Sequence, residues 1–155
     1  MDNNKVNHIK VTEKTIVQNK YLNELKLSIY EQLKQMKCDD ILFPTEENFV
    51  MEFWNTEFKK NKKTQRTSLG WHTDDYEVIP YKTYTAIVYY YRGDGITGGN
   101  LTIEDANDTI TIDTWSNKTF LIFKGEMRHC PQEVTVIDNT KKLKRQIVTM
   151  FFARK

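Results

Sequence analysis

After residue 66 the chain consists almost entirely of short segments rich in β-branched and aromatic residues, with turns between them. Segments of this composition are typical of β-strands. They follow one another roughly every 8 to 14 residues after the first long one, a rhythm that predicts an antiparallel sandwich or barrel rather than alternating strands and helices. The segments are residues 83–91, 100–104, 108–113, 119–123, 133–138 and 145–153.

The N-terminal third of the chain carries the one clear helical pattern. Apolar residues recur at steps of three and four between about Gln18 and Lys37, with polar residues between them. Residues 5–11 and 48–58 look like strands. These elements predict a mainly β (α+β) domain with its N-terminal helix packed on the outside of one sheet. The periodic apolar residues are Leu22, Leu25, Ile29, Leu33 and Met36.

The length of 155 residues predicts a single domain, residues 1–155. We expect an N-terminal strand and helix at about 5–37 and a β core at about 48–155. Residues 59–66 carry five positive charges, which predicts a solvated hairpin loop; contact with an acidic partner is the alternative.

The charge and the hydropathy of the chain limit the partners and the cellular compartments that we expect for it. Lys and Arg number 23 against 21 Asp and Glu, so the chain has no strong positive field and nucleic acid is an unfavoured partner. No apolar run approaches the ~18 residues that a membrane span needs, and the N-terminus has no apolar signal-peptide core. With only Cys38 and Cys130, the sequence predicts reduced thiols in a cytoplasmic protein.

Two of the three histidines stand in a pattern that could bind a metal. His72 and Asp74 are two residues apart, so in an extended segment they point to the same side. His129 follows a predicted strand. Two histidines and one carboxylate form the facial triad of non-haem Fe(II) oxygenases. From the residues alone, His129 could equally be a hydrogen-bonded sheet-edge histidine or a general base, and His8 an exposed side chain.

The chain resembles the 2-oxoglutarate- and Fe(II)-dependent dioxygenases, in particular their prolyl 4-hydroxylase-like branch. The resemblance covers about residue 48 to the C-terminus and depends on five motifs in the family's order. They are HTD (72–74), TAIVYY (85–90), GGNL (98–101), FLIFKGEMRH (120–129) and RQIVT (145–149).

This resemblance implies a double-stranded β-helix (jelly-roll) core. It implies that His72, Asp74 and His129 are both the catalytic centre and the ligands of Fe(II). It also implies that Arg145 pairs with the distal carboxylate of 2-oxoglutarate, a role that suits a planar, permanently charged fork. Thr149, four residues further along the same strand, matches a position near the cosubstrate.

A tyrosine on the strand after the HTD motif is also implied to contact 2-oxoglutarate. Tyr89 matches this position. Tyr90 and Tyr91 follow it directly, so the contacting tyrosine could be one of these instead. Because side chains on a strand point alternately to its two faces, Tyr91 is expected to point to the same face as Tyr89. Gly98 and Gly99 are expected to let the backbone turn tightly.

The implied reaction consumes 2-oxoglutarate and O2, releases succinate and CO2, and hydroxylates a C–H bond; ascorbate is left open as a reductant. Asp74 favours hydroxylation, because related halogenases carry Ala or Gly at that position. The expected substrate is a peptidyl proline, lying between the 59–66 segment and residues 71–81, with Trp71 and Tyr76 stacking on its ring. A free amino acid, another small metabolite, a nucleobase, or a non-catalytic jelly-roll binding module are the alternatives.

Overall fold

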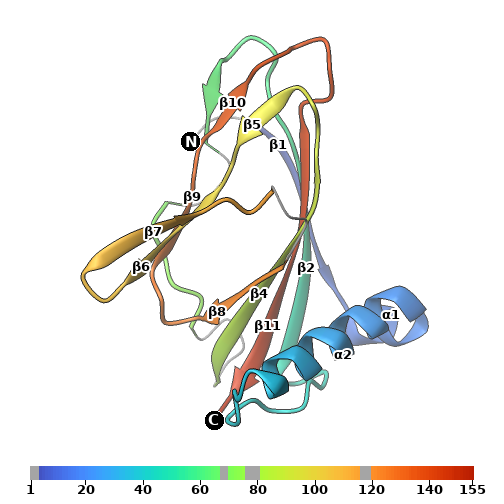
Figure 1. The fold of residues 1–155 in the computed structure, drawn as a ribbon. Helices are drawn as coiled ribbons and strands as arrows, with labels where there is room; N and C mark the ends of the chain where they lie inside the picture. Colours follow the sequence, from blue (N-terminus) through green and yellow to red (C-terminus); the bar gives the residue numbers. More distant parts are fainter. Residues whose placement is uncertain (1–3, 67–69, 76–80, 116–119) are drawn as a thin grey trace.

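The computed structural model describes residues 4–66, 70–75, 81–115 and 120–155 (Figure 1). Strands dominate the described residues, and both helices lie near the N-terminus. The elements are β1 (Lys5–Val11), α1 (Glu13–Gln18), α2 (Lys20–Gln35), β2 (Phe49–Glu57), β3 (Thr64–Gln65), β4 (Lys82–Arg92), β5 (Ile96–Gly98), β6 (Leu101–Asp105), β7 (Asp108–Ile112), β8 (Phe120–Lys124), β9 (His129–Pro131), β10 (Val134–Val136) and β11 (Lys144–Arg154).

The strands form two layers that face each other. One layer is a five-stranded antiparallel sheet in the order β1-β2-β11-β4-β8. Two smaller sheets, β3-β10-β5 and β7-β6-β9, lie opposite it (Figure 1). This arrangement is the double-stranded β-helix, so the prediction of a mainly β jelly-roll fold is confirmed. The strands expected from the alternating segments are all present, while β3, β5 and β9 were too short to be recognised in the sequence.

The five-stranded sheet separates two apolar regions, because successive side chains on each strand point to opposite faces. On its outer face Met51, Ala86 and Met150 pack against Ile29 and Leu33 of α2. On its inner face a second cluster joins the sheet to the smaller layer. This inner cluster contains Ile87, Tyr89, Leu101, Ile103 and Phe123. The space between the layers is where the candidate site lies.

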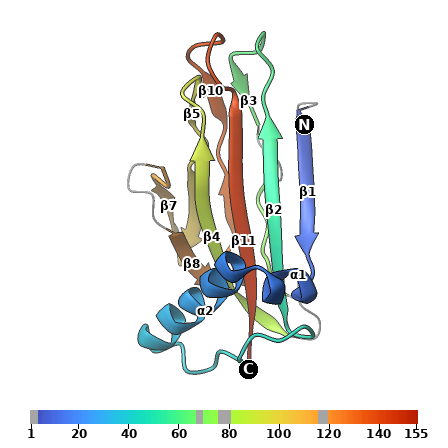
Figure 2. The ribbon, with the colours of Figure 1, turned by 90° about the vertical axis from the view of Figure 1, so that its right-hand side faces the viewer.

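The helical region contains two helices rather than the single one expected at about 18–37. The break is at Asn19, whose backbone leaves the helical conformation (φ −106°, ψ 109°) and ends α1. Its side-chain oxygen accepts hydrogen bonds from the backbone N–H groups of Tyr21 and Leu22, which caps the start of α2. Helix α2 packs on the outside of the five-stranded sheet, as expected (Figure 2). Neither helix is long and apolar enough to cross a membrane, for the residues that the structure describes.

The 59–66 segment is not the hairpin loop that its charges suggested. Its short strand β3 pairs with β10 instead of folding back on β2. Gln65 is only 1% exposed, and its side chain bonds the backbone of Lys59 and Lys62. The lysines are solvent-exposed as expected, but a buried glutamine organises the turn that carries them.

Candidate metal centre

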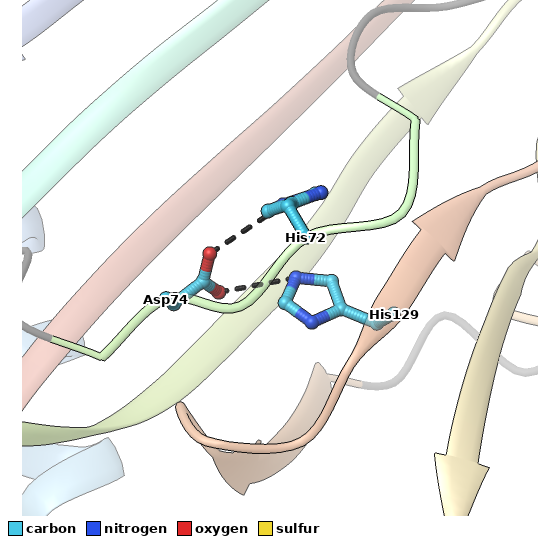
Figure 3. Close-up of side chains that lie close together, drawn as sticks. All are labelled: His72, Asp74 and His129. Atoms are coloured by element: carbon cyan, nitrogen blue, oxygen red, sulfur yellow. Dashed lines mark ion pairs between the residues drawn. The ribbon is translucent and has the colours of Figure 1, made fainter.

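A pair of backbone hydrogen bonds brings the two histidines of the expected triad together. His72 N–H donates to the carbonyl of His129 at 3.0 Å, and His129 N–H donates to the carbonyl of His72 at 2.9 Å. The imidazole centroids lie 4.2 Å apart. Asp74 N–H donates to the carbonyl of Gly125 at 2.7 Å, which fixes the third residue beside them. The HTD segment therefore lies along the start of β9, and the three side chains converge (Figure 3).

The three side chains present one oxygen or nitrogen each to a common point. Asp74 Oδ1 lies 3.5 Å from His72 Nε2, and Oδ2 lies 3.2 Å from His129 Nε2 (Figure 3). All three ligand atoms are within 4.8 Å of one another. Bonds of about 2.1 Å that meet at right angles put neighbouring ligand atoms about 3 Å apart, so the spacing suits one divalent ion. Asp74 and His129 are buried and His72 is partly exposed, which leaves one side of the centre accessible.

Backbone carbonyls fix which nitrogen of each histidine faces the centre. His72 Nδ1 is 2.8 Å from the carbonyl of Gly70, and His129 Nδ1 is 2.9 Å from the carbonyl of Met127. A carbonyl can only accept, so each Nδ1 carries the proton and each Nε2 offers a lone pair. A histidine that binds a metal through Nε2 typically donates its Nδ1 proton in this way.

Two further residues hold the ligands in place, and sequence reasoning did not single them out. The hydroxyl of Thr85 on β4 donates to Asp74 Oδ2 at 2.9 Å. Phe123 on β8 packs edge-on against the His129 ring, with 4.6 Å between centroids. Both point inward from the five-stranded sheet. Their alternating position on a strand facing the centre was the only signal that could have found them.

The metal ligands open into a cavity of about 310 Å³ between the two layers. Arg145, Tyr89 and Thr149, the three residues expected near a cosubstrate, line it together with the three triad residues. Most of the remaining lining is apolar. These other residues are His8, Glu52, Trp54, Thr85, Ile87, Gly99, Asn100, Leu101, Pro131, Ile147 and Phe151.

Arg145 is a buried cation with no carboxylate partner in the described part of the chain. It is 4% exposed, and its Nε has no hydrogen-bond partner among the described residues. No described carboxylate lies within ion-pair distance of its guanidinium, in contrast to Arg154 on the same strand. Burial lowers the pKa of Arg145 to about 10, an effect that the nearby Tyr89 phenol partly offsets. A buried charge of this kind needs an anionic ligand to balance it.

The structure separates the three adjacent tyrosines. Tyr89 is buried in the cavity, and burial raises the pKa of its phenol to about 12 although Arg145 acts to lower it. Tyr90 is 73% exposed. A β-bulge follows, because Ile147 pairs with Tyr89 but Gln146 pairs with Tyr91. Tyr91 consequently does not line the cavity, and the expectation that it faces the same way as Tyr89 is wrong.

Among the elements expected to bind a peptide, residues 59–66 and Trp71 do not line the cavity. None of residues 59–66 lines it; Lys60, Asn61 and Lys63 border a separate hollow beside β10. Trp71 is exposed, with the Arg128 guanidinium 5.5 Å from its ring, and it does not line the cavity either. Tyr76 lies outside the described residues. His8, which the sequence suggested was simply exposed, does reach the cavity.

No family model matches this chain, and no curated protein sequence matches it significantly. Its fold is similar to that of several solved structures. A prolyl 4-hydroxylase from Phytophthora capsici aligns with 95% of the chain at 11% identity and a TM-score of 0.63, and a Pseudomonas putida prolyl-4-hydroxylase with 98% at 16% identity and 0.58. The Fe(II)/α-ketoglutarate-dependent dioxygenase TqaL aligns with 97% at 13% identity and 0.57.

The chain spans 47% of the Phytophthora protein, 73% of the Pseudomonas protein and 67% of TqaL. At identities of 11–16% such similarity establishes the fold and leaves the chemistry to be argued from the site. The chain has the double-stranded β-helix fold that these oxygenases share, with a His-Asp-His group at its centre.

Proposed function

We propose that this protein is an Fe(II)- and 2-oxoglutarate-dependent dioxygenase that hydroxylates a C–H bond. His72, Asp74 and His129 would hold the iron, and Arg145 would hold the distal carboxylate of 2-oxoglutarate. The observation that carries the proposal is a buried Arg145 guanidinium, with no carboxylate partner in the described part of the chain, in the same cavity as a complete metal-binding triad. Fold similarity to oxygenases supports it but does not select the chemistry.

The Arg145 guanidinium and the metal-binding triad would bind different parts of one ligand. A guanidinium recognises a carboxylate through a planar fork. The triad leaves open coordination positions that a second carboxylate or a carbonyl can occupy. A short dicarboxylate with an oxo group therefore satisfies both groups, and Tyr89 and Thr149 line the same cavity with hydroxyl groups.

Each residue has a defined task in this proposal. With both groups bound, iron and 2-oxoglutarate supply oxidative decarboxylation to succinate and CO2 coupled to hydroxylation of the substrate. The triad imidazoles present Nε2 because Gly70 and Met127 accept their Nδ1 protons. Apolar walls such as Ile147 exclude water, which strengthens the Arg145–carboxylate pair.

Two substrate classes remain under this proposal. The resemblance to prolyl 4-hydroxylases favours a peptidyl proline, and two solved structures of similar fold are prolyl 4-hydroxylases. The free amino acid or small metabolite is the alternative. The cavity itself adds no support for a peptide groove, because neither the 59–66 segment nor Trp71 lines it.

The proposal is tested by measuring ligand binding and turnover separately. Anaerobic addition of Fe(II) and then 2-oxoglutarate should produce a visible charge-transfer absorption band, and O2 should then release succinate even without a prime substrate. Asp74→Ala should remove both signals, while Glu57→Gln, at an exposed position at the end of β2 outside the cavity, is the control. Binding of iron and 2-oxoglutarate without any succinate release would instead identify a non-catalytic binding module.

A further inference from the structure

A histidine and a glutamate that the proposed chemistry does not use lie in the same cavity. His8 on β1 and Glu52 on β2 both line it, and His8 Nε2 is hydrogen-bonded to Glu52 Oε2. The two strands form one edge of the five-stranded sheet (Figure 2). The His8 side chain is 41% exposed and that of Glu52 is 11% exposed, so the pair extends from the rim of the cavity into its interior.

The indole of Trp54 holds this pair in place. The His8 ring stacks on it with 3.8 Å between centroids and an interplanar angle of 16°. Trp54 Nε1 in turn donates a hydrogen bond to the Thr149 hydroxyl at 3.3 Å. Side chains from β1, β2 and β11 are thereby linked. Groups fixed in this way lose little conformational freedom when a ligand binds.

The register of the sheet places Glu52 beside the cosubstrate region. Glu52 pairs directly with Thr149, and Arg145 pairs with Thr56 further along the same two strands. The ligand Asp74 accepts a hydrogen bond from Thr85 of β4, and β4 is separated from β2 by β11. Arg145 is committed to the cosubstrate in the proposed function, so Glu52 faces the space that is left for the molecule to be oxidised.

The chemistry of Glu52 restricts what can occupy that space. The residue is 8% exposed, and its second oxygen, Oε1, has no hydrogen-bond partner among the described residues. This oxygen is not among the fully buried side-chain atoms that lack a partner, so it is accessible from the cavity, where a bound donor can take the place of water. A cationic nitrogen supplies one with a charge-assisted bond. The ring nitrogen of a peptidyl proline has neither charge nor N–H, so the proline residue itself offers Oε1 no donor.

The size of the cavity points in the same direction. Its volume of about 310 Å³ is at the lower end of the roughly 300–1,000 Å³ typical of ligand pockets, and it must hold 2-oxoglutarate as well. We infer that the Glu52–His8 pair binds the cationic nitrogen of the substrate, and that the substrate is a small molecule with a free amino group. The inference rests on the proposed function and selects the small-molecule alternative over peptidyl proline.

The test compares each free amine with its neutral counterpart. Free amino acids and simple aliphatic amines are offered beside their N-acetylated forms and beside proline-containing peptides. Binding is followed by the NMR signal of the Trp54 indole N–H, identified by its loss in Trp54→Phe, and turnover by succinate release. We expect free amines to shift the signal and stimulate succinate release, while the N-acetylated forms do neither. Glu52→Gln should raise the KM for the amine on the order of ten- to a hundred-fold, with a smaller change in kcat.

Glu57→Gln is the matched control, because Glu57 lies on the same strand but outside the cavity, and it should leave this KM unchanged. The inference fails if no free amine shifts the Trp54 signal, if N-acetylated forms or peptides act as well as amines, or if both glutamate variants behave alike. In each case, slow 2-oxoglutarate decay by the wild type would leave the proposed function standing. Amine binding that depends on Glu52 without any 2-oxoglutarate decay would support the inference and refute the proposed function.

Discussion

Replacing Arg145 by methionine should stabilise the ligand-free protein while it removes 2-oxoglutarate binding. Burial lowers the pKa of this guanidinium from 12.5 to about 10, which corresponds to a cost of about 3 kcal/mol for keeping it charged in the folded state. Because the folded state lowers the pKa of a base, the cost applies in full below about pH 10. It declines as the pH rises from there towards 12.5. At neutral pH the variant avoids it entirely.

The expected change is large enough to measure by thermal denaturation. For a domain of this size 1 kcal/mol shifts Tm by about 2–4 °C, so removal of the whole cost raises Tm by up to about 6–12 °C. Iron-loaded wild type should recover stability on ligand binding, by about 2.7 kcal/mol at 2-oxoglutarate concentrations a hundred times Kd. At the same concentration Arg145→Met should gain no more than about 0.9 kcal/mol, since loss of the buried pair costs roughly 2–5 kcal/mol, a factor of at least ~30 in affinity.

Arg154→Met is the matched control, because it removes a second buried arginine from the same strand. Its guanidinium lies 3.7 Å from Asp40 and 3.5 Å from Glu126, and its Nε donates to the carbonyl of Thr83 at 3.2 Å. Removing a partnered charge should lower the free energy of unfolding, by roughly 3 kcal/mol. If Arg145→Met lowers the Tm of the ligand-free protein as Arg154→Met does, the argument from an uncompensated charge is refuted.

Three further substitutions test the support of the site and its separation from the outer core. Thr85→Val removes the hydrogen bond to Asp74 and should weaken metal affinity about 10- to 100-fold in a calorimetric titration, with little loss of stability. Gly99→Ala places a Cβ at φ +73°, 3.2 Å from the Val134 side chain, and should cost about 1–2 kcal/mol in urea denaturation. Leu33→Ala empties a fully buried position on the outer face and should cost roughly 2–5 kcal/mol; a changed metal affinity in this variant would contradict the separation of the two apolar regions.

The elements that depend on local pattern could be predicted from the sequence. The spacing of Ile29 and Leu33 identified the face of α2 that packs on the sheet. The spacing of His72 and Asp74 placed both side chains on one side of an extended segment, and the structure brings them to His129. Each of these inferences uses only residues that are near one another in the chain, whose relative directions are set by the helical or strand period.

The neighbours across the sheet were decided by the tertiary structure. His8 and Glu52 are 44 residues apart, and they meet only because β1 pairs with β2 in the register that sets His8 opposite Trp54. The bulge that turns Tyr91 away from the cavity likewise depends on β11, more than fifty residues later. Alternation fixes the two faces of a strand but not its partner or its register. These come from the joint burial of distant segments, which also buries Arg145 with no carboxylate partner among the residues that the structure describes.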